Sequence, residues 1–179
     1  MPAANRIGEE GRGLDVAYSS STLYGRPNLT AVALGIHQAI ADDTVAFCRD
    51  RELYGEPLAK LRTIAQKLGD MQSRLLTARL AACHAVHLLD RRRPCDAELM
   101  NAKLVNTESA LTSARAALEI FAGRGTQRDH HIERYLRDVI HTFPAAGTSD
   151  VQRLRLAEVA LGHYCGDWSG RLGDRKSVV

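Results

Sequence analysis

Aromatic residues are scarce in this sequence, at 5% of its 179 residues. Combined with few β-branched residues and abundant Ala, Leu and Arg, this scarcity disfavours a β-sandwich or barrel and favours helices. The chain also lacks any run that approaches the roughly 20 apolar residues of a membrane span. Residues 1–13 lack the apolar core of a signal peptide. We therefore expect an all-α, cytoplasmic protein with no membrane span.

The sequence also has no marked excess of positive or negative charge. Lys and Arg number 24 against 21 Asp and Glu, and the net charge of +3 gives no indication of a nucleic-acid partner. The four cysteines (Cys48, Cys83, Cys95 and Cys165) include no CxxC pair and follow no regular spacing. We expect buried, reduced thiols rather than a zinc site or a disulfide framework.

Apolar positions recur at helical spacing along most of the chain and predict an antiparallel up-and-down bundle of about four long helices and one short one. The long helices are expected at 27–54, 57–89, 97–121 and 151–161, and the short one at 131–140. Pro94 and the Gly123-Arg124-Gly125 segment mark breaks. Asp96 is expected to cap the third helix, and Thr148 or Ser149 the last.

The segments outside these helices are interpreted as connections. Residues 1–26, which contain several glycines and a Ser-Ser-Ser-Thr run, are read as a linker, and residues 27–165 as the bundle. The chain is expected to fray from His163, with a flexible tail at 166–179. Histidines near Cys83 and the His130-His131 pair have poor metal-ligand geometry, and no ExxH motif of a di-iron bundle occurs, so no metal site is predicted.

Several short motifs along the chain, taken in their order, are more specific than the helical periodicity. The chain contains PAANRIGEEGRGLDVA (2–17), GRP (25–27), RELYG (51–55), AQKLGDM (65–71), AGRG (122–125), IERYLRD (132–138) and AAGTSDVQ (145–152). These segments resemble the carboxyl-terminal helical domain of the flavin-dependent acyl-CoA dehydrogenases, which has RxxFG, QxxLADM, GGxG, VERxYRD and YEGTxxIQ at the corresponding places. The first segment resembles the stretch that leaves the family's central β-domain.

The resemblance implies a mechanism that this chain carries only in part. In the family, FAD accepts a β-hydride from an acyl-CoA while a glutamate removes the α-proton. An amino-terminal helical domain and the β-domain complete the acyl-CoA pocket and one side of the flavin, and neither is found in these residues. The resemblance therefore implies little or no dehydrogenase activity for this chain alone.

The resemblance assigns roles to individual residues of this sequence. Arg51 stands at the place of the arginine that contacts the flavin pyrophosphate of a neighbouring subunit, a role suited to a planar, permanent cation. Tyr54 matches the adjoining aromatic position, and Gly123 belongs to the glycine motif. Thr148 matches the threonine that faces the pyrophosphate at a helix start, where anions are favoured. Arg26 matches a substrate-side arginine, although an ordinary cation at a helix entry remains the alternative.

The departures from the family pattern concern the catalytic base. Ala146 stands where the glutamate of YEGT belongs, and Gly25 stands at the alternative base position, so no catalytic residue is carried over. A positioned general base contributes roughly 100- to 10,000-fold to the rate. Arg62, Glu119 and Asp150 replace flavin-facing glutamines, and the two acids would disfavour a diphosphate unless Arg62 or Arg124 paired with them.

Three hypotheses follow from these observations. The first is a subunit of a flavin-dependent acyl-CoA oxidoreductase that self-associates at least as a dimer. The second is one part of an active enzyme, completed by a separate chain with the amino-terminal and β-domains, or a fragment of a longer enzyme. The third is a scaffold or interaction bundle that binds no flavin.

Overall fold

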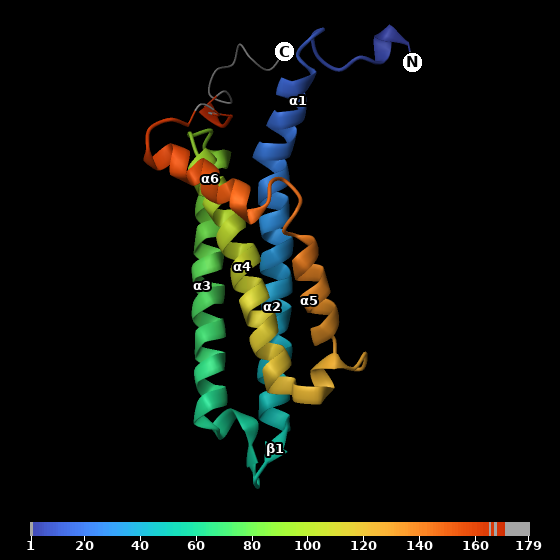
Figure 1. The fold of residues 1–179 in the computed structure, drawn as a ribbon, viewed down its shortest axis with the longest axis vertical. Helices are drawn as coiled ribbons and strands as arrows, with labels where there is room; N and C mark the ends of the chain where they lie inside the picture. The colour runs from blue at the N-terminus through green and yellow to red at the C-terminus, as the bar shows by residue number, and fades with distance from the viewer. Residues whose placement is uncertain (1, 165, 167, 171–179) are drawn as a thin grey trace.

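The structure is a computed structural model that describes residues 2–164, 166 and 168–170. It confirms the all-α fold class, with three long helices running alternately up and down and shorter helices beside and across them (Figure 1). The elements in chain order are η1 (Ala3–Asn5), α1 (Gly13–Ser19), η2 (Ser20–Gly25), α2 (Arg26–Asp50), β1 (Glu52–Leu53), β2 (Glu56–Pro57), η3 (Leu58–Lys60), α3 (Arg62–Asp90), α4 (Asp96–Phe121), η4 (Ala122–Thr126), α5 (Ile132–His141) and α6 (Ser149–Ala160).

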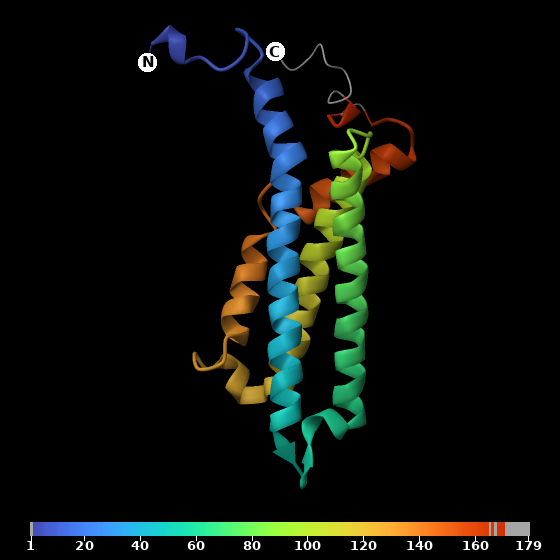
Figure 2. The same cartoon turned by 180° about the vertical axis from the view of Figure 1, so that it is seen from behind.

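The first long helix starts at Gly13 and not at the expected Pro27. α1, η2 and α2 form one continuous rod, whose first turns project beyond the rest of the bundle (Figure 2). The serine-rich stretch read as a linker is accommodated in a wider π-helical turn, η2. Thr22 donates a hydrogen bond to the Tyr18 carbonyl at 2.6 Å, and Leu23 is buried, which together hold this stretch helical.

A short hairpin reverses the chain after α2. β1 and β2 pair antiparallel, with Leu53 opposite Glu56. The two residues between them, Tyr54 and Gly55, have φ values of 55° and 80°. Two successive positive φ angles are the mark of a type I′ turn, which matches the twist of a two-residue hairpin. α3 therefore begins at Arg62, later than Pro57, because the hairpin and η3 occupy the intervening residues.

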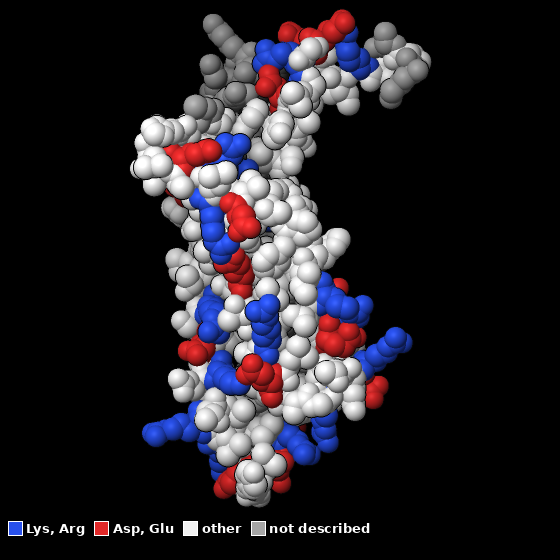
Figure 3. Space-filling model, viewed as in Figure 1, with Lys and Arg blue, Asp and Glu red and all other residues white. Residues whose placement is uncertain are grey.

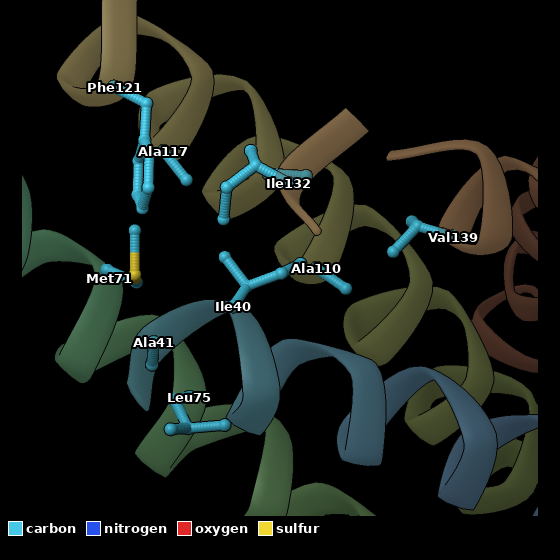
Figure 4. Close-up of a cluster of buried hydrophobic side chains, with 10 residues drawn as sticks. Ile40, Ala41, Met71, Leu75, Ala110, Ala117, Phe121, Ile132 and Val139 are labelled. Carbon is cyan, nitrogen blue, oxygen red and sulfur yellow. The ribbon is translucent and has the colours of Figure 1, made fainter. Parts of the chain in front are cut away.

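The α4 helix is the centre of the bundle and packs against α2, α3 and α5. Its buried side includes Ala110, Ala114 and Ala117, none of which is exposed to solvent. Small side chains let neighbouring helices approach closely, and larger apolar side chains fill the remaining space. The main cluster comprises Ile40, Ala41, Met71, Leu75, Ala110, Ala114, Ala117, Phe121, Ile132 and Val139, from four helices (Figure 4).

Asp96 has a different role from the predicted helix cap. Cys95 is the N-cap residue of α4, and Asp96 is the first helical residue. The Asp96 carboxylate instead accepts hydrogen bonds from the backbone N–H of Ser169 at 2.9 Å, from the Ser169 hydroxyl and from the Trp168 N–H at 3.3 Å. A buried carboxylate needs such donors, so Asp96 anchors the C-terminal segment to the start of α4.

This anchoring packs the described residues Trp168 and Ser169 against the bundle, whereas fraying from His163 and a flexible tail at 166–179 stay predictions. Ser169 is fully buried, and Trp168 stacks on Tyr18 with ring centroids 5.6 Å apart. Residues 171–179 lie outside the described residues. Sequence periodicity could not find this contact, because it joins residues more than 70 positions apart without a repeating pattern.

Cysteine burial follows the prediction only in part. Cys48 and Cys95 are buried and free, whereas Cys83 is free but exposed on the outer side of α3, which contradicts the expectation for that thiol. Cys165 lies outside the described residues. Within the described residues, no three His, Cys, Asp or Glu side chains are grouped to hold a metal ion. The helices described here include none long and apolar enough to span a membrane.

Candidate functional site

Arg51 and Tyr54 lie together where the hairpin projects from the end of the bundle. Arg51 follows the last residue of α2, and Tyr54 opens the hairpin turn, with its side chain 89% exposed. The Arg51 guanidinium is exposed and makes no hydrogen bond or ion pair with any described residue. An unpaired cation beside an exposed ring is suited to an anionic, ring-bearing ligand. Alone, however, two exposed side chains cannot enclose one.

Gly123 lies at the same end, in η4 directly after α4. It is exposed, and a Cβ added there would meet nothing within 4 Å, so close approach by a ligand is sterically open. Glu119, one turn earlier, forms an ion pair with Lys67 rather than with Arg62 or Arg124. This pairing offsets the acidic charge that replaces a family glutamine. A groove of about 230 Å³ between α3 and α4 runs beside the pair.

Thr148 occupies a separate place at the start of α6. Its hydroxyl accepts a hydrogen bond from the Val151 N–H at 3.4 Å, which confirms it as the helix cap. A helix start favours anions, but Asp150 in the first turn already supplies a negative charge and is 95% exposed. Its partner is Arg153, at 3.5 Å. The predicted pyrophosphate contact of Thr148 therefore faces a nearby acidic group.

The structure does not bring all predicted cofactor contacts together. Arg51 follows the end of α2, whereas Thr148 lies two residues from Ala146, which packs beside Gly25 just before α2 begins. The 25 residues of α2 separate these ends by about 37 Å at 1.5 Å per residue. The predicted cofactor contacts therefore fall in two separate regions of the chain.

Arg26 is buried rather than presented at the surface. Its side chain is only 7% exposed, and its Nε and Nη1 atoms have no hydrogen-bond partner among the described residues. Burial lowers the pKa of Arg26, and nearby Tyr164 and Asp96 oppose this shift. Nε and Nη1 belong to different edges of the guanidinium plane, so no one carboxylate can pair with both. The predicted substrate contact of Arg26 stays a prediction.

Lys103 is a buried cation that the sequence analysis did not single out. It is 1% exposed, and its Nζ donates to the Phe143 carbonyl at 2.9 Å and to the Gly147 carbonyl. Burial, with a smaller effect from Arg26, lowers its pKa to about 8. Lys103 thereby fixes the loop that carries Ala146 against α4. Its position among Leu99, Ala102 and Asn106 on the buried side of a helix is the only signal that could have identified it.

Gly25 and Ala146, the two positions that the sequence resemblance assigns to the catalytic base, lie side by side. A Cβ added to Gly25 would lie 3.9 Å from the Ala146 Cβ, although the two residues are 121 positions apart. Both residues are partly exposed. A carboxylate at either position would therefore reach the same region. Neither Gly25 nor Ala146 has a side chain that can accept a proton.

Comparisons with known proteins identify the family of this chain. The family sequence model described as "Acyl-CoA dehydrogenase, C-terminal domain" matches residues 11–161. The chain belongs to the acyl-CoA dehydrogenase family. A Bacillus subtilis acyl-CoA dehydrogenase is 35% identical over 162 residues, which are 90% of this chain and 42% of that protein. The short-chain specific mitochondrial acyl-CoA dehydrogenase of Rattus norvegicus is 37% identical over 164 residues, 92% of this chain and 40% of that protein.

A solved structure extends the agreement to three dimensions. Butyryl-CoA dehydrogenase from Megasphaera elsdenii superposes with a TM-score of 0.86 at 32% identity, covering 90% of this chain and 42% of that one. The chain thus spans about two fifths of the length of these acyl-CoA dehydrogenases. The resemblance drawn from the sequence motifs is confirmed, and so is its restriction to the C-terminal helical domain.

Proposed function

We propose that this chain is an assembly domain of a flavin-dependent acyl-CoA oxidoreductase in the cytoplasm, with little or no activity alone. It supplies Arg51, Tyr54 and Gly123 to a flavin held mainly by other domains, and Thr148 to a second one. Those domains belong to a separate chain with the amino-terminal and β-domains, or to a longer protein of which these residues are part. Acyl-CoA is the substrate class that the family implies.

One observation carries this proposal: Arg51, Tyr54 and Gly123, the residues predicted to contact flavin, are exposed and open. Arg51 is unpaired among the described residues, Tyr54 is 89% exposed, and Gly123 has free space at its Cα. An exposed, unpaired cation beside an exposed ring is accessible to an anionic, ring-bearing ligand held by another domain. FAD bound there would supply the hydride acceptor. The residues of this chain would contribute charge and stacking surface to it, without a base.

The amino-terminal rod gives a second reason to expect a partner. α1 has no buried residue, and residues 16–25 carry no charge. Leu14 is 73% exposed, and Tyr18 and Tyr24 are 51% and 56% exposed. Figure 3 shows this stretch as an almost uncharged column below the charged N-terminal residues. An exposed apolar surface of this kind is typical of one that another domain covers.

The decisive experiment is a visible absorption spectrum of the purified chain after mixing with FAD and gel filtration. It is carried out with and without a companion chain that bears the two missing domains. We expect flavin to be retained only with the companion, and Arg51→Ala to weaken that retention. Arg128→Ala, an exposed arginine outside the carried-over set, is the matched control. Retention that Arg51→Ala leaves unchanged would contradict the proposed contact.

A scaffold without flavin is the second candidate. The missing base at Gly25 and Ala146 and the acidic Glu119 and Asp150 favour it. In that case the companion chain would bind this one, as sedimentation would show, but the complex would retain no flavin. Co-sedimentation and flavin absorbance measured on the same sample therefore separate the two candidates.

A further inference from the structure

The described residues that follow α6 lie over the start of α4. We call Tyr164, Gly166, Trp168 and Ser169 the C-terminal strap. None of these four residues belongs to an α-helix or a β-strand. The strap lies at the end of the bundle from which the rod projects (Figures 1 and 2). Its position therefore depends on individual contacts and not on a repeating backbone pattern.

Asp96 connects the strap to the bundle. Its carboxylate accepts hydrogen bonds from the backbone and hydroxyl of Ser169, from the Trp168 N–H and, at 3.4 Å, from the Tyr164 hydroxyl. The Ser169 hydroxyl also accepts a hydrogen bond from the Cys95 N–H at 2.7 Å. Because Cys95, the N-cap residue of α4, makes no side-chain cap hydrogen bond, Ser169 satisfies a backbone group at the start of this helix.

Tyr164 lies beside the buried guanidinium of Arg26. Its phenol is near enough to oppose, together with Asp96, the lowering of the Arg26 pKa that burial causes. Arg26 is only 7% exposed, and it forms no ion pair with any described residue. The strap thus contributes a side chain to the cover over an unpaired cation.

Covering Arg26 costs free energy that other contacts of the strap offset. A buried guanidinium without an ion pair has lost its hydration and has gained no carboxylate in return. Trp168 packs against a small apolar cluster and stacks on Tyr18 of the rod. The covered state is therefore a balance of opposing terms, and a segment held by a few contacts can open locally at low cost.

Gly166 makes this placement of Tyr164 possible. A Cβ added to Gly166 would collide with the ring and the hydroxyl of Tyr164. A single methyl group at this position therefore displaces the Tyr164 ring and leaves the Arg26 and Asp96 side chains unaltered. Gly166→Ala is accordingly a selective means of moving the part of the strap that lies beside Arg26.

We propose that the C-terminal strap is a lid over Arg26, closed in this structure and held closed by Asp96. Its meaning for catalysis rests on the proposed function, since Arg26 is the predicted substrate-side arginine. An anionic group of acyl-CoA contacts Arg26 only when the lid is open. The closure itself is a property of this chain alone and needs neither flavin nor a companion chain.

The first test measures how fast phenylglyoxal, a small reagent that reacts with guanidinium groups, modifies Arg26 in the full chain. Mass spectrometry of peptides gives the rate for each arginine. We expect wild-type Arg26 to react at least about 10-fold more slowly than the exposed Arg128, and Gly166→Ala to remove most of this difference. Gly69→Ala is the matched control, because a Cβ there meets nothing within 4 Å.

The second test uses Trp168, the only tryptophan of the chain, as a reporter of the lid. Asp96→Asn replaces one acceptor oxygen with an amide that confronts the donors of the strap. We expect the Trp168 emission to shift to longer wavelength, its quenching by acrylamide to increase, and Arg26 to react faster in the same sample. Asp138→Asn, at an exposed site on α5, is the matched control. Circular dichroism and the thermal midpoint establish that each variant is folded.

The outcomes separate the lid from the proposed function. Folded Gly166→Ala and Asp96→Asn variants in which Arg26 stays as unreactive as in the wild type would overturn the lid. Wild-type Arg26 that reacts as fast as Arg128 would overturn it as well, because nothing would then be covered. Unchanged Trp168 emission in Asp96→Asn would overturn the role of Asp96. Flavin retention with the companion chain is measured separately, and its failure would leave these results unaffected.

Discussion

His37 Nε2 and Ser113 Oγ lie 2.7 Å apart between α2 and α4, and both residues are fully buried. Nδ1 of His37 has no hydrogen-bond partner among the described residues. Burial, followed by the positive charge of Arg74, lowers the pKa of His37 to about 4 from 6.5. A neutral histidine is therefore part of the bundle core.

The folded chain should lose stability in mild acid because of His37. Between pH 6.5 and 4 the unfolded chain binds a proton at this histidine that the folded chain does not. The free energy of unfolding therefore decreases as the pH is lowered from 6.5 to 4. The loss attributable to His37 is at most about 3 kcal/mol. Urea denaturation at several pH values should show a smaller slope in His37→Gln. His141→Gln, at an exposed site, should keep the wild-type slope.

Lys103→Met should lower the free energy of unfolding by about 2 kcal/mol at pH 7, because the carbonyls of Phe143 and Gly147 lose their donor. The difference should grow from pH 8 toward pH 10.5. Over that range the unfolded lysine keeps a proton that the folded one, with its pKa lowered to about 8, releases. Lys60→Met, on an exposed ion pair with Glu56, should change stability by less than about 0.5 kcal/mol. Equal losses in the two variants would contradict the role of Lys103.

Ala122→Gly should stabilise the chain. Ala122 ends α4 with φ 51° and ψ −136°, a backbone region that favours glycine, and the family motif has glycine there. Relief of this strain should raise the thermal midpoint by an amount that corresponds to about 1 kcal/mol. Ala46→Gly, at an exposed position within α2, should cost about 1 kcal/mol instead. A destabilising Ala122→Gly would show that the turn is not strained.

Ala146→Glu should restore a proton acceptor. In the flavin-loaded complex with the companion chain, we expect acyl-CoA turnover to rise by roughly 100- to 10,000-fold. Ala146→Gln has nearly the same size without the basic carboxylate and should leave turnover low. Because Gly25 adjoins Ala146, Gly25→Glu should act in the same direction. An equal effect of Ala146→Gln and Ala146→Glu would argue against base catalysis at this position.

Periodicity predicted those features of the fold that repeat along the chain. The α3 and α4 helices and the short α5 follow from apolar residues three and four positions apart, and Thr148 followed from capping preference. The early start at Gly13 was missed because serine and glycine usually end helices, whereas a π-helical turn accommodates them here.

Long-range polar contacts lay beyond reach of the sequence. Three examples are the hydrogen bond from Ser169 to Asp96, the burial of Lys103 and the hydrogen bond between His37 and Ser113. They depend on how the helices pack against one another, which a single sequence does not reveal. Motifs singled out Arg51, Tyr54, Gly123 and Thr148 as cofactor contacts, and that role stays a prediction. They could not show that the first three lie at one end of the bundle and the last near the other.

The unbroken rod from Gly13 to Asp50 has a mechanical consequence. A rigid helix transmits rotation, so a domain joined rigidly to its first turn would swing by about 100° around the rod axis for each residue inserted or deleted below it. Two such changes would nearly reverse the face presented to the bundle, while four would almost restore it. The number of residues between Gly13 and Arg26 therefore sets the azimuth of anything attached there.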